Sequence, residues 1–453
     1  MFRYKGHRIR AGDQHLVYHV VFSWLFLLFV GWMTIFHFRD LRRFDITSLS
    51  LSKIDFTLVM EDFVSLLSSL ILSGSIMLLY VHFFQNHWRS LWHRQKLARM
   101  ILENHWYEVR QVQSEGFFKD LGNNRTKEKI SYFLKIYYRM KNGILSIQVQ
   151  ISLGKYQDQL LKLEKKLESG LYCELIEKEL KDSYVEYTLL YDMVANRIGI
   201  EEVVAENGVL QLMKNQVWAY DSLPHMLIAG GTGSGKTYFL LTIIEALLKS
   251  DAELFILDPK NADLADLGTV MPNVYSHKGE ISACVEDFYE RMMARSIEMK
   301  EMSNYKTGEN YAYLGLPPNF LIFDEYVAYM EMLTTKENAI VLNKLKQIVM
   351  LGRQSGFFLI LACQRPDAKY LGDGIRDQFN FRVALGRMSE LGYSMMFGEV
   401  DKSFFLKRIK GRGYVDTGNS VISEFYTPLV PKGYDFLNSI HEVMEKKDQS
   451  FHC

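Results

Sequence analysis

The chain has 453 residues, more than one ordinary hydrophobic core supports, so we expect two or three domains. Lysine plus arginine and aspartate plus glutamate both number 53, so the formal net charge is zero. The net charge therefore does not indicate a nucleic-acid partner, and any nucleic-acid-binding site must be formed by side chains that line one part of the surface. The four cysteines are scattered without a C-x-x-C spacing, which argues against a zinc site or a disulfide framework.

The N-terminal region contains two long apolar runs, at residues 16–36 and 63–84, and neither run contains Asp, Glu, Lys or Arg. At 1.5 Å per residue of helix, each run spans roughly 30 Å, the thickness of a bilayer's hydrocarbon core. The first run is too long for a signal peptide and lacks a small-residue cleavage site. We therefore predict a membrane anchor at residues 1–100 with two transmembrane helices.

Positive charge around the two runs predicts their orientation. Lysines and arginines precede the first run and follow the second, whereas the connecting loop carries both signs. A glycine-rich motif later in the chain, described below, predicts a nucleotide site that must also face the cytoplasm. We therefore predict a multi-pass protein of the cell membrane with both ends in the cytoplasm. Ser65, Ser69 and Ser73 recur every four residues, which indicates either close helix packing or simple tolerance of serine in a membrane helix.

Residues 101–216 predict a small α+β domain with a packing or assembly role. Residues 147–153 alternate apolar and polar side chains, as a half-buried strand does, and Asn142-Gly143 predicts a hairpin that pairs them with residues 129–140. Leu160, Leu163 and Leu167 mark one face of a charged helix that is too short for a coiled coil. No pattern in this stretch indicates catalysis.

A glycine-rich stretch within residues 226–248 is the strongest motif of the sequence. Four apolar residues predict a short buried strand before the glycines, and an apolar helix follows them, as the G-x-x-x-x-G-K-[ST] pattern requires. Glycines let successive backbone N–H groups curve around phosphates, and the helix N-terminus adds its positive end. The residues predicted to bind ATP are Gly230, Gly231, Thr232, Gly233, Ser234, Gly235, Lys236 and Thr237.

Two pairs of residues have specific predicted roles in ATP hydrolysis. Lys236 supplies a positive charge to the β- and γ-phosphates, and the Thr237 hydroxyl can ligate Mg²⁺. Residues 320–323 predict a buried strand that ends in Asp324 and Glu325, the arrangement of a Walker B motif. Asp324 would hold the Mg²⁺ shell, and Glu325 would orient or deprotonate the attacking water.

Three further candidates lie around the next predicted strands. Gln364 follows the strand at residues 357–362, so it shares a sheet edge with Asp324 and can sense the γ-phosphate or position water. Arg353 precedes that strand and could reach only a neighbouring subunit's nucleotide, as an arginine finger in trans. Arg382 is the second candidate finger, and for both arginines a surface or structural role is the alternative.

The alternation of strands and helices after the glycine-rich loop predicts an α/β domain at residues 217–453 with a mostly parallel sheet. Its ordered motifs resemble those of the FtsK/SpoIIIE family (HerA/FtsK superfamily) of DNA-translocating ATPases. The resemblance covers roughly residues 201–428 and rests on the glycine-rich loop with its preceding strand, Asp258-Pro259-Lys260, Asp324-Glu325 and the run from Gly352 to Pro366. It implies a RecA-like ATPase that works as a hexameric ring, with DNA in the pore, ATP between subunits and Arg353 as the likelier finger.

The layout departs from that of the chromosome-segregating members of the family. Those carry about four membrane helices, a long linker and a C-terminal winged-helix domain, whereas here two apolar runs precede one motor and only 22 residues follow Pro431. This compact layout resembles coupling proteins of Gram-positive conjugative plasmids and integrative conjugative elements, which implies a relaxase or channel proteins as partners. The alternatives are an ATPase for protein secretion and a membrane adaptor that docks relaxase-bound DNA.

Overall fold

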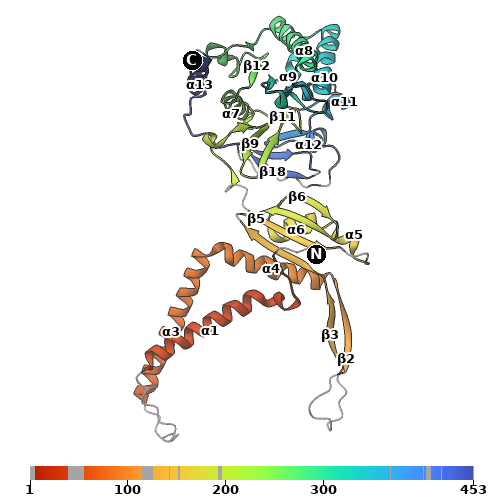
Figure 1. Cartoon of the computed structure of the whole chain (residues 1–453). Helices are drawn as coiled ribbons and strands as arrows, with labels where there is room; N and C mark the ends of the chain where they lie inside the picture. The colour runs from red at the N-terminus through yellow and green to blue at the C-terminus, as the bar shows by residue number, and fades with distance from the viewer. Residues whose placement is uncertain are drawn as a thin grey trace. The chain divides into compact units, whose positions relative to one another are not determined.

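The structure, a computed structural model, describes the chain except for residues 1–5, 39–55, 114–125, 142, 152–153, 192–195, 368, 401, 403, 405–409, 420 and 452–453 (Figure 1). The described residues form two compact units. The first comprises residues 1–173 and 179–187, and the second comprises residues 174–178 and 188–453. The division into an anchor, a small domain and a motor domain stays a prediction.

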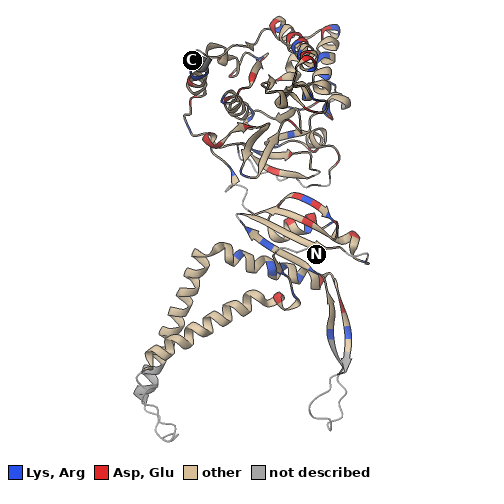
Figure 2. Ribbon diagram, viewed as in Figure 1, with Lys and Arg blue, Asp and Glu red and all other residues tan. Residues whose placement is uncertain are grey.

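Two long apolar helices, α1 (Leu16–Phe36) and α3 (Phe56–Phe83), contain the residues of the two predicted membrane segments up to Phe83. By length and composition, Ala11–Phe36 and Phe63–Phe83 could each cross a membrane. Figure 2 shows that charged residues are rare along both helices and frequent in the next one, α4 (Gln85–Glu103). A short 3₁₀ helix, Ala11–His15, precedes α1.

The serine stripe of α3 lies at a packed position in the first unit. Ser69 and Ser73 are buried, and α1 and α3 contact each other. The Ser69 and Ser73 hydroxyls donate to the carbonyls four residues earlier, which satisfies these polar groups within their own helix. At the end of α1, the His37 imidazole hydrogen-bonds the Ser65 hydroxyl at 2.9 Å. These contacts favour the close-packing interpretation of the stripe.

A five-stranded sheet has the order β1-β4-β5-β7-β6, and all of its strands except β1 follow the helices in the sequence. The predicted hairpin is present, because β4 and β5 pair antiparallel with Lys141 opposite Ile144; Asn142 lies outside the described residues. Residues 129–133 were expected in this hairpin but lie in a second one, β2–β3, which pairs separately. The strands are β1 (His7–Arg8), β2 (Tyr107–Gln113), β3 (Thr126–Phe133), β4 (Ile136–Lys141), β5 (Ile144–Gln150), β6 (Glu174–Lys181) and β7 (Tyr184–Leu190).

The predicted leucine face is buried, although on two short helices instead of one. Leu160 ends α5 (Gln157–Leu160), Leu167 lies in α6 (Glu164–Leu171), and Leu163 is the N-cap of α6. All three side chains are buried. The apolar spacing therefore located the buried face, while the break between the helices was not visible in it.

The second unit contains an eight-stranded sheet with the order β13-β12-β14-β15-β11-β16-β17-β18. The first six strands of this order pair parallel to one another. Strand β17 pairs antiparallel with β16, and β18 pairs antiparallel with β17. The mostly parallel sheet predicted here is therefore present. Strand β15 separates β11, which leads into the glycine-rich loop, from β14. The strands are β11 (Met226–Gly230), β12 (Glu253–Leu257), β13 (Val274–Tyr275), β14 (Asn319–Phe323), β15 (Phe357–Cys363), β16 (Phe381–Leu385), β17 (Arg412–Asp416) and β18 (Ile422–Tyr426).

Helices cover both faces of this sheet, with α7 and α13 on one side and α8, α9 and α10 on the other (Figure 1). Every residue of β11, β14 and β15 is buried, and burying a Leu, Ile or Phe side chain contributes roughly 1.5–3 kcal/mol. The helices are α7 (Lys236–Leu248), α8 (Lys278–Glu301), α9 (Tyr326–Met332), α10 (Thr335–Ser355), α11 (Asp373–Arg376), α12 (Glu390–Phe397) and α13 (Phe436–Phe451).

A three-stranded sheet precedes the large one in the second unit. It consists of β8 (Ala205–Glu206), β9 (Val209–Met213) and β10 (Gln216–Ala219), all antiparallel. Short 3₁₀ helices occupy Ile200–Glu202, Ala265–Thr269 and Tyr311–Leu314. The predicted motifs lie at the carboxyl edge of the large sheet and not in this small one.

Candidate nucleotide-binding site

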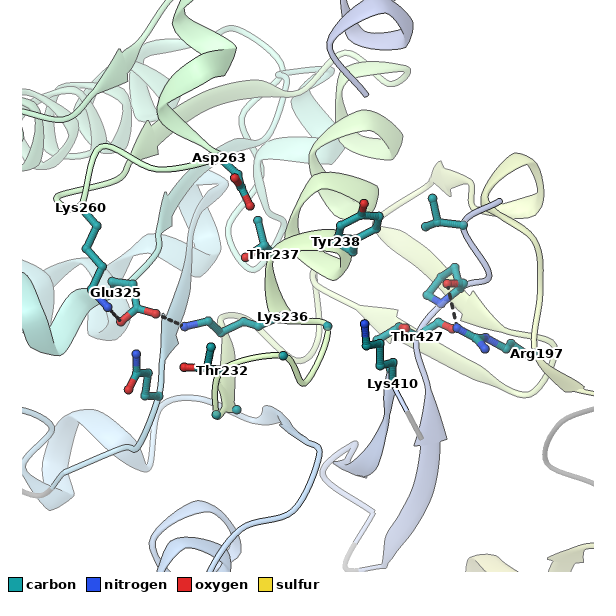
Figure 3. A pocket seen from close by; sticks show the side chains of 18 residues that line it. Arg197, Thr232, Lys236, Thr237, Tyr238, Lys260, Asp263, Glu325, Lys410 and Thr427 are labelled. Atoms are coloured by element: carbon teal, nitrogen blue, oxygen red, sulfur yellow. Dashed lines mark hydrogen bonds and ion pairs between the residues drawn. The ribbon is translucent and has the colours of Figure 1, made fainter. Parts of the chain in front are cut away.

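A cavity of about 650 Å³ lies at the carboxyl ends of the parallel strands (Figure 3). Ligands of open α/β sheets gather at this edge, since the loops after the strands meet there. Its lining includes all the predicted ATP-binding residues except Ser234, together with Glu325 and Gln364. The adjoining Tyr238 and residues from other parts of the sequence complete it: Arg197, Lys260, Asp263, Lys410, Gly411, Thr427, Pro428 and Val430.

The glycine-rich loop takes a backbone path that favours glycine at three positions. Gly233 and Gly235 have φ +78° and +99°, in the left-handed region that other residues avoid. A Cβ on Gly230 would lie 2.5 Å from the Ser234 hydroxyl oxygen, too close for a side chain to fit. The Gly411 N–H donates to the Ser234 carbonyl at 2.9 Å, so the loop is also held from outside. Helix α7 begins directly after it, at Lys236.

Lys236 and the two carboxylates after β14 form one ionic cluster. The Lys236 ammonium donates to Glu325 Oε1 at 2.5 Å and lies 3.3 Å from Asp324 Oδ1, and its side chain is only 7% exposed. A second lysine, Lys260, donates to Glu325 Oε2 at 2.9 Å. Figure 3 shows Lys236 and Lys260 approaching Glu325 from opposite sides. The cluster thus joins the loops after β11, β12 and β14.

Burial and neighbouring charges have opposite effects on the pKa values of the groups in this cluster. Burial raises the pKa of Asp324 above its ordinary value, despite the nearby Lys236. Burial also acts to raise the pKa of Glu325, but the hydrogen bonds from the two lysines outweigh it and leave that pKa lowered. The pKa of Lys236 is raised, because both carboxylates outweigh the burial that opposes its charge. Lys236 and Glu325 are therefore an ion pair.

The turn at Glu325 directs this residue out of the strand. Its φ is +47°, a left-handed conformation that costs of order 1–3 kcal/mol for a residue with a side chain and that often occurs at functional sites. The Glu325 N–H donates to Asp324 Oδ1 at 2.8 Å, which ties the two acidic residues together. Helix α9 starts at the following residue.

The groups present fit a magnesium ion, which prefers hard oxygen ligands and keeps several waters. Thr237 is one of the lining residues, whereas Asp324 is buried, lies 3.3 Å from the Lys236 ammonium and is not one of them. These two side chains would hold the ion. When bound, it would neutralise charge on the phosphates.

The structure places the two candidate arginines away from the cavity lining. Arg353 is exposed in the last turn of α10, at the end opposite to the cavity, because β15 separates it from Gln364. Arg382 is largely enclosed, and its guanidinium donates to the carbonyls of Phe379, Met396 and Arg376 at 2.7, 2.9 and 3.0 Å. These bonds indicate a structural role for Arg382 and leave Arg353 as the exposed candidate.

The chain also matches known proteins. The family profile described as "Helicase HerA, central domain" matches residues 221–355. The FtsK domain-containing protein YdcQ of Bacillus subtilis (strain 168) is 48% identical over 447 residues, which cover 98% of this chain and 92% of that protein. The chain belongs to the FtsK domain-containing proteins.

More distant relatives of this FtsK domain-containing protein share only part of its length. The DNA translocase FtsK of Borreliella burgdorferi is 24% identical over 213 residues, which cover 44% of this chain and 26% of that protein. A solved structure of the conjugation coupling protein TcpA of pCW3 with ATPγS aligns with a TM-score of 0.48 and 18% identity, over 69% of this chain and 93% of that one. Membership of the family makes the protein a P-loop ATPase that binds ATP.

Several lining residues of this FtsK domain-containing protein have no role in the sequence-based site. Lys260 belongs to the Asp-Pro-Lys stretch that supported the family resemblance, so a signal existed for it. No sequence pattern indicated Arg197 or Thr427 as site residues. The Arg197 guanidinium nevertheless donates a hydrogen bond to the Thr427 carbonyl at 2.6 Å, across 230 residues of sequence. Only the fold brings these two residues together at the cavity.

Proposed function

We propose that this FtsK domain-containing protein is a membrane-anchored, ATP-driven DNA translocase that acts as a coupling protein and delivers DNA to a conjugative transfer channel. One observation carries the proposal. A cavity lined by the glycine-rich loop, Glu325 and Gln364 lies in the same chain as two helices of bilayer-spanning length. A motor that feeds a membrane channel needs both parts.

The proposed hydrolytic roles follow from the positions around the cavity. Lys236 and the backbone of the glycine-rich loop bind the phosphates, while Thr237 and Asp324 hold Mg²⁺. Glu325 accepts a proton from the attacking water, for which its ionised state is suited. Gln364, exposed at the same sheet edge, positions water or senses the γ-phosphate.

The proposed assembly is a hexameric ring of RecA-like motors with DNA in the pore. Arg353 supports it, because an exposed arginine at the sheet edge opposite the chain's own cavity is available to a neighbour's nucleotide. A relaxase or other conjugation-channel proteins are the proposed partners. Helices α1 and α3 are proposed to cross the cell membrane, with the motor in the cytoplasm.

The DNA dependence of ATP turnover tests the proposal. The full chain, purified in detergent, is assayed alone, with single-stranded DNA, with double-stranded DNA, and with heparin as a polyanion that is not DNA. A DNA translocase predicts turnover that rises with one form of DNA and not with heparin. An ATP turnover rate that neither form of DNA changes would contradict the proposal and favour protein secretion or an adaptor role.

A further inference from the structure

Lys260 is a second lysine on the proposed catalytic glutamate, and it has no role in the function proposed above. Its ammonium lies 2.9 Å from Glu325 Oε2, while Lys236 binds the other carboxylate oxygen at 2.5 Å. The two lysines come from different loops, since Lys260 follows β12 and Lys236 begins α7. Both line the nucleotide cavity.

The loop that carries Lys260 is fixed by a buried carboxylate. Asp258, only 1% exposed, accepts hydrogen bonds from the backbone N–H groups of Lys260, Ala262 and Ala265 at 3.1, 2.8 and 3.2 Å. An aspartate that bonds the following backbone in this way fixes a turn. Lys260 therefore extends from a defined backbone position, unlike a lysine on a free surface loop.

Bound ATP is expected to change the hydrogen bond between Lys236 and Glu325. In the proposed mechanism Lys236 turns to the β- and γ-phosphates, so its hydrogen bond to Glu325 weakens or is lost. The same phosphates bring negative charge close to the Glu325 carboxylate, and like charges repel. Lys260 lies on the opposite carboxylate oxygen, so its bond does not depend on the position of Lys236.

We propose that Lys260 is a positioning residue that holds the Glu325 carboxylate in its reactive orientation once ATP has engaged Lys236. This inference rests on the proposed roles of Lys236 and Glu325. Lys260 acts through Glu325 and not on the phosphates, so its loss affects the chemical step and leaves nucleotide binding largely unchanged. Misplacing a catalytic group by about 1 Å costs about a hundred-fold in rate, which sets the scale of the expected effect.

The test compares ATP turnover and nucleotide affinity in variants of the full chain in detergent. Lys260→Met keeps the length of the side chain and removes its charge, and Lys260→Arg keeps the charge. We expect kcat to fall about ten-fold to a hundred-fold in Lys260→Met, with KM and the Kd for a fluorescent ATP analogue within about two-fold of wild type. Lys260→Arg is expected to recover most of the lost kcat.

Lys278→Met provides a matched control on the same unit. Lys278 pairs with Glu337 at 2.9 Å and its side chain is 41% exposed, whereas Lys260 pairs with Glu325 at 2.9 Å and is 40% exposed. Lys278 does not line the nucleotide cavity. A lysine that merely forms a surface ion pair predicts equal, small effects in the two variants, and that equality would overturn the inference.

The double variant with Glu325→Gln separates positioning from direct action. If Lys260 acts through Glu325, Lys260→Met lowers kcat much less in the Glu325→Gln background than in wild type. The same fold loss in both backgrounds, or a raised KM with normal kcat, would overturn the inference. Full turnover in Glu325→Gln itself overturns both this inference and the proposed role of Glu325. Normal turnover in Lys260→Met beside a slow Glu325→Gln overturns this inference alone.

Discussion

Apolar residues dominate both the paired helices α1 and α3 and the central strands β11, β14 and β15, yet the two regions expose them in opposite ways. Leu27 in α1 is 64% exposed and Leu78 in α3 is 73% exposed. Every residue of the three strands is buried. A soluble protein rarely exposes so much contiguous apolar surface, so helices of this kind suit contact with lipid.

The difference also separates the proposed membrane anchor from the candidate nucleotide-binding site. The central strands are buried on both faces, which restricts their movement. The residues that follow their carboxyl ends are therefore held in defined positions, as in the ionic cluster of Lys236, Asp324 and Glu325. The apolar helices contain small hydroxyl groups that are satisfied within their own helix, such as Ser69 and Ser73. Changes in one region should therefore leave the other region's property intact.

Lys236→Ala should give the largest effect and should affect only the motor. Removing the ammonium that reaches the phosphates is expected to abolish ATP turnover and DNA transfer, while membrane insertion stays normal. ATP hydrolysis, DNA transfer and membrane fractionation are measured together. DNA transfer at the wild-type level without hydrolysis would contradict a motor, and loss from the membrane fraction would contradict the separation of the two regions.

Arg353→Ala should impair hydrolysis only in the assembled ring, since the side chain is proposed to serve a neighbour's nucleotide. A trans arginine contributes about a thousand-fold or more to phosphoryl transfer, so the loss should be large while nucleotide binding stays normal. Mixing Arg353→Ala with Lys236→Ala subunits should restore activity at interfaces that regain one intact lysine and one intact arginine. No recovery at any mixing ratio, with ring assembly verified, would count against the trans role.

Arg382→Ala is the matched comparison for Arg353→Ala. Its guanidinium bonds three carbonyls of its own chain, so its removal leaves these groups unpaired and costs about 1–3 kcal/mol for each one that stays buried. We expect a lower thermal unfolding midpoint for Arg382→Ala and an unchanged midpoint for Arg353→Ala. The reverse pattern would exchange the roles assigned to the two arginines.

Glu325→Gln should bind ATP normally and hydrolyse it about a hundred-fold more slowly or worse, because the amide cannot accept a proton. Asp324→Asn should instead raise the Mg²⁺ concentration needed for half-maximal turnover. Both are measured as ATP turnover across a magnesium titration. A Glu325→Gln variant with full turnover would show that the base lies elsewhere.

Shortening the chain should have the smallest effect on chemistry. A chain that begins at Gln85 loses α1, α3 and the edge strand β1 but keeps α4, whose Leu97 and Ala98 are buried in the first unit. We expect it to be soluble without detergent, to bind ATP normally and to assemble less readily, because anchoring raises local concentration. A chain that begins after residue 99 also removes most of α4 and should be less stable. Insolubility of the Gln85 variant would contradict the proposed lipid contact of α1 and α3.

Local patterns in the sequence predicted a large part of this structure. The apolar runs predicted α1 and most of α3, and the strand, glycine loop and helix pattern predicted β11 and α7, because each signal spans only neighbouring residues. The ends of parallel strands share one edge, so Gln364 and Glu325 were expected at the same cavity, and both line it. Their chemical roles stay predictions.

Those local patterns could not predict contacts between residues that are far apart in the sequence. The second lysine on Glu325 depends on how the loop after β12 folds around Asp258, and Arg197 meets Thr427 only through the fold. Arg382 appeared as a candidate finger because the sequence could not reveal its three carbonyl partners. Residues 129–133 were placed in the wrong hairpin, since alternation identifies a strand but not its partner.

The displacement of a bound oligonucleotide from a DNA track tests the central claim most directly, because it reports movement along DNA and not merely binding. The full chain in detergent is supplied with ATP and a DNA substrate that carries a triplex-forming strand at a distance from the loading site. The account predicts displacement that requires ATP and is lost in Glu325→Gln, while DNA binding persists in that variant. Normal ATP turnover on this DNA without displacement, or displacement by Glu325→Gln at the wild-type rate, would contradict it.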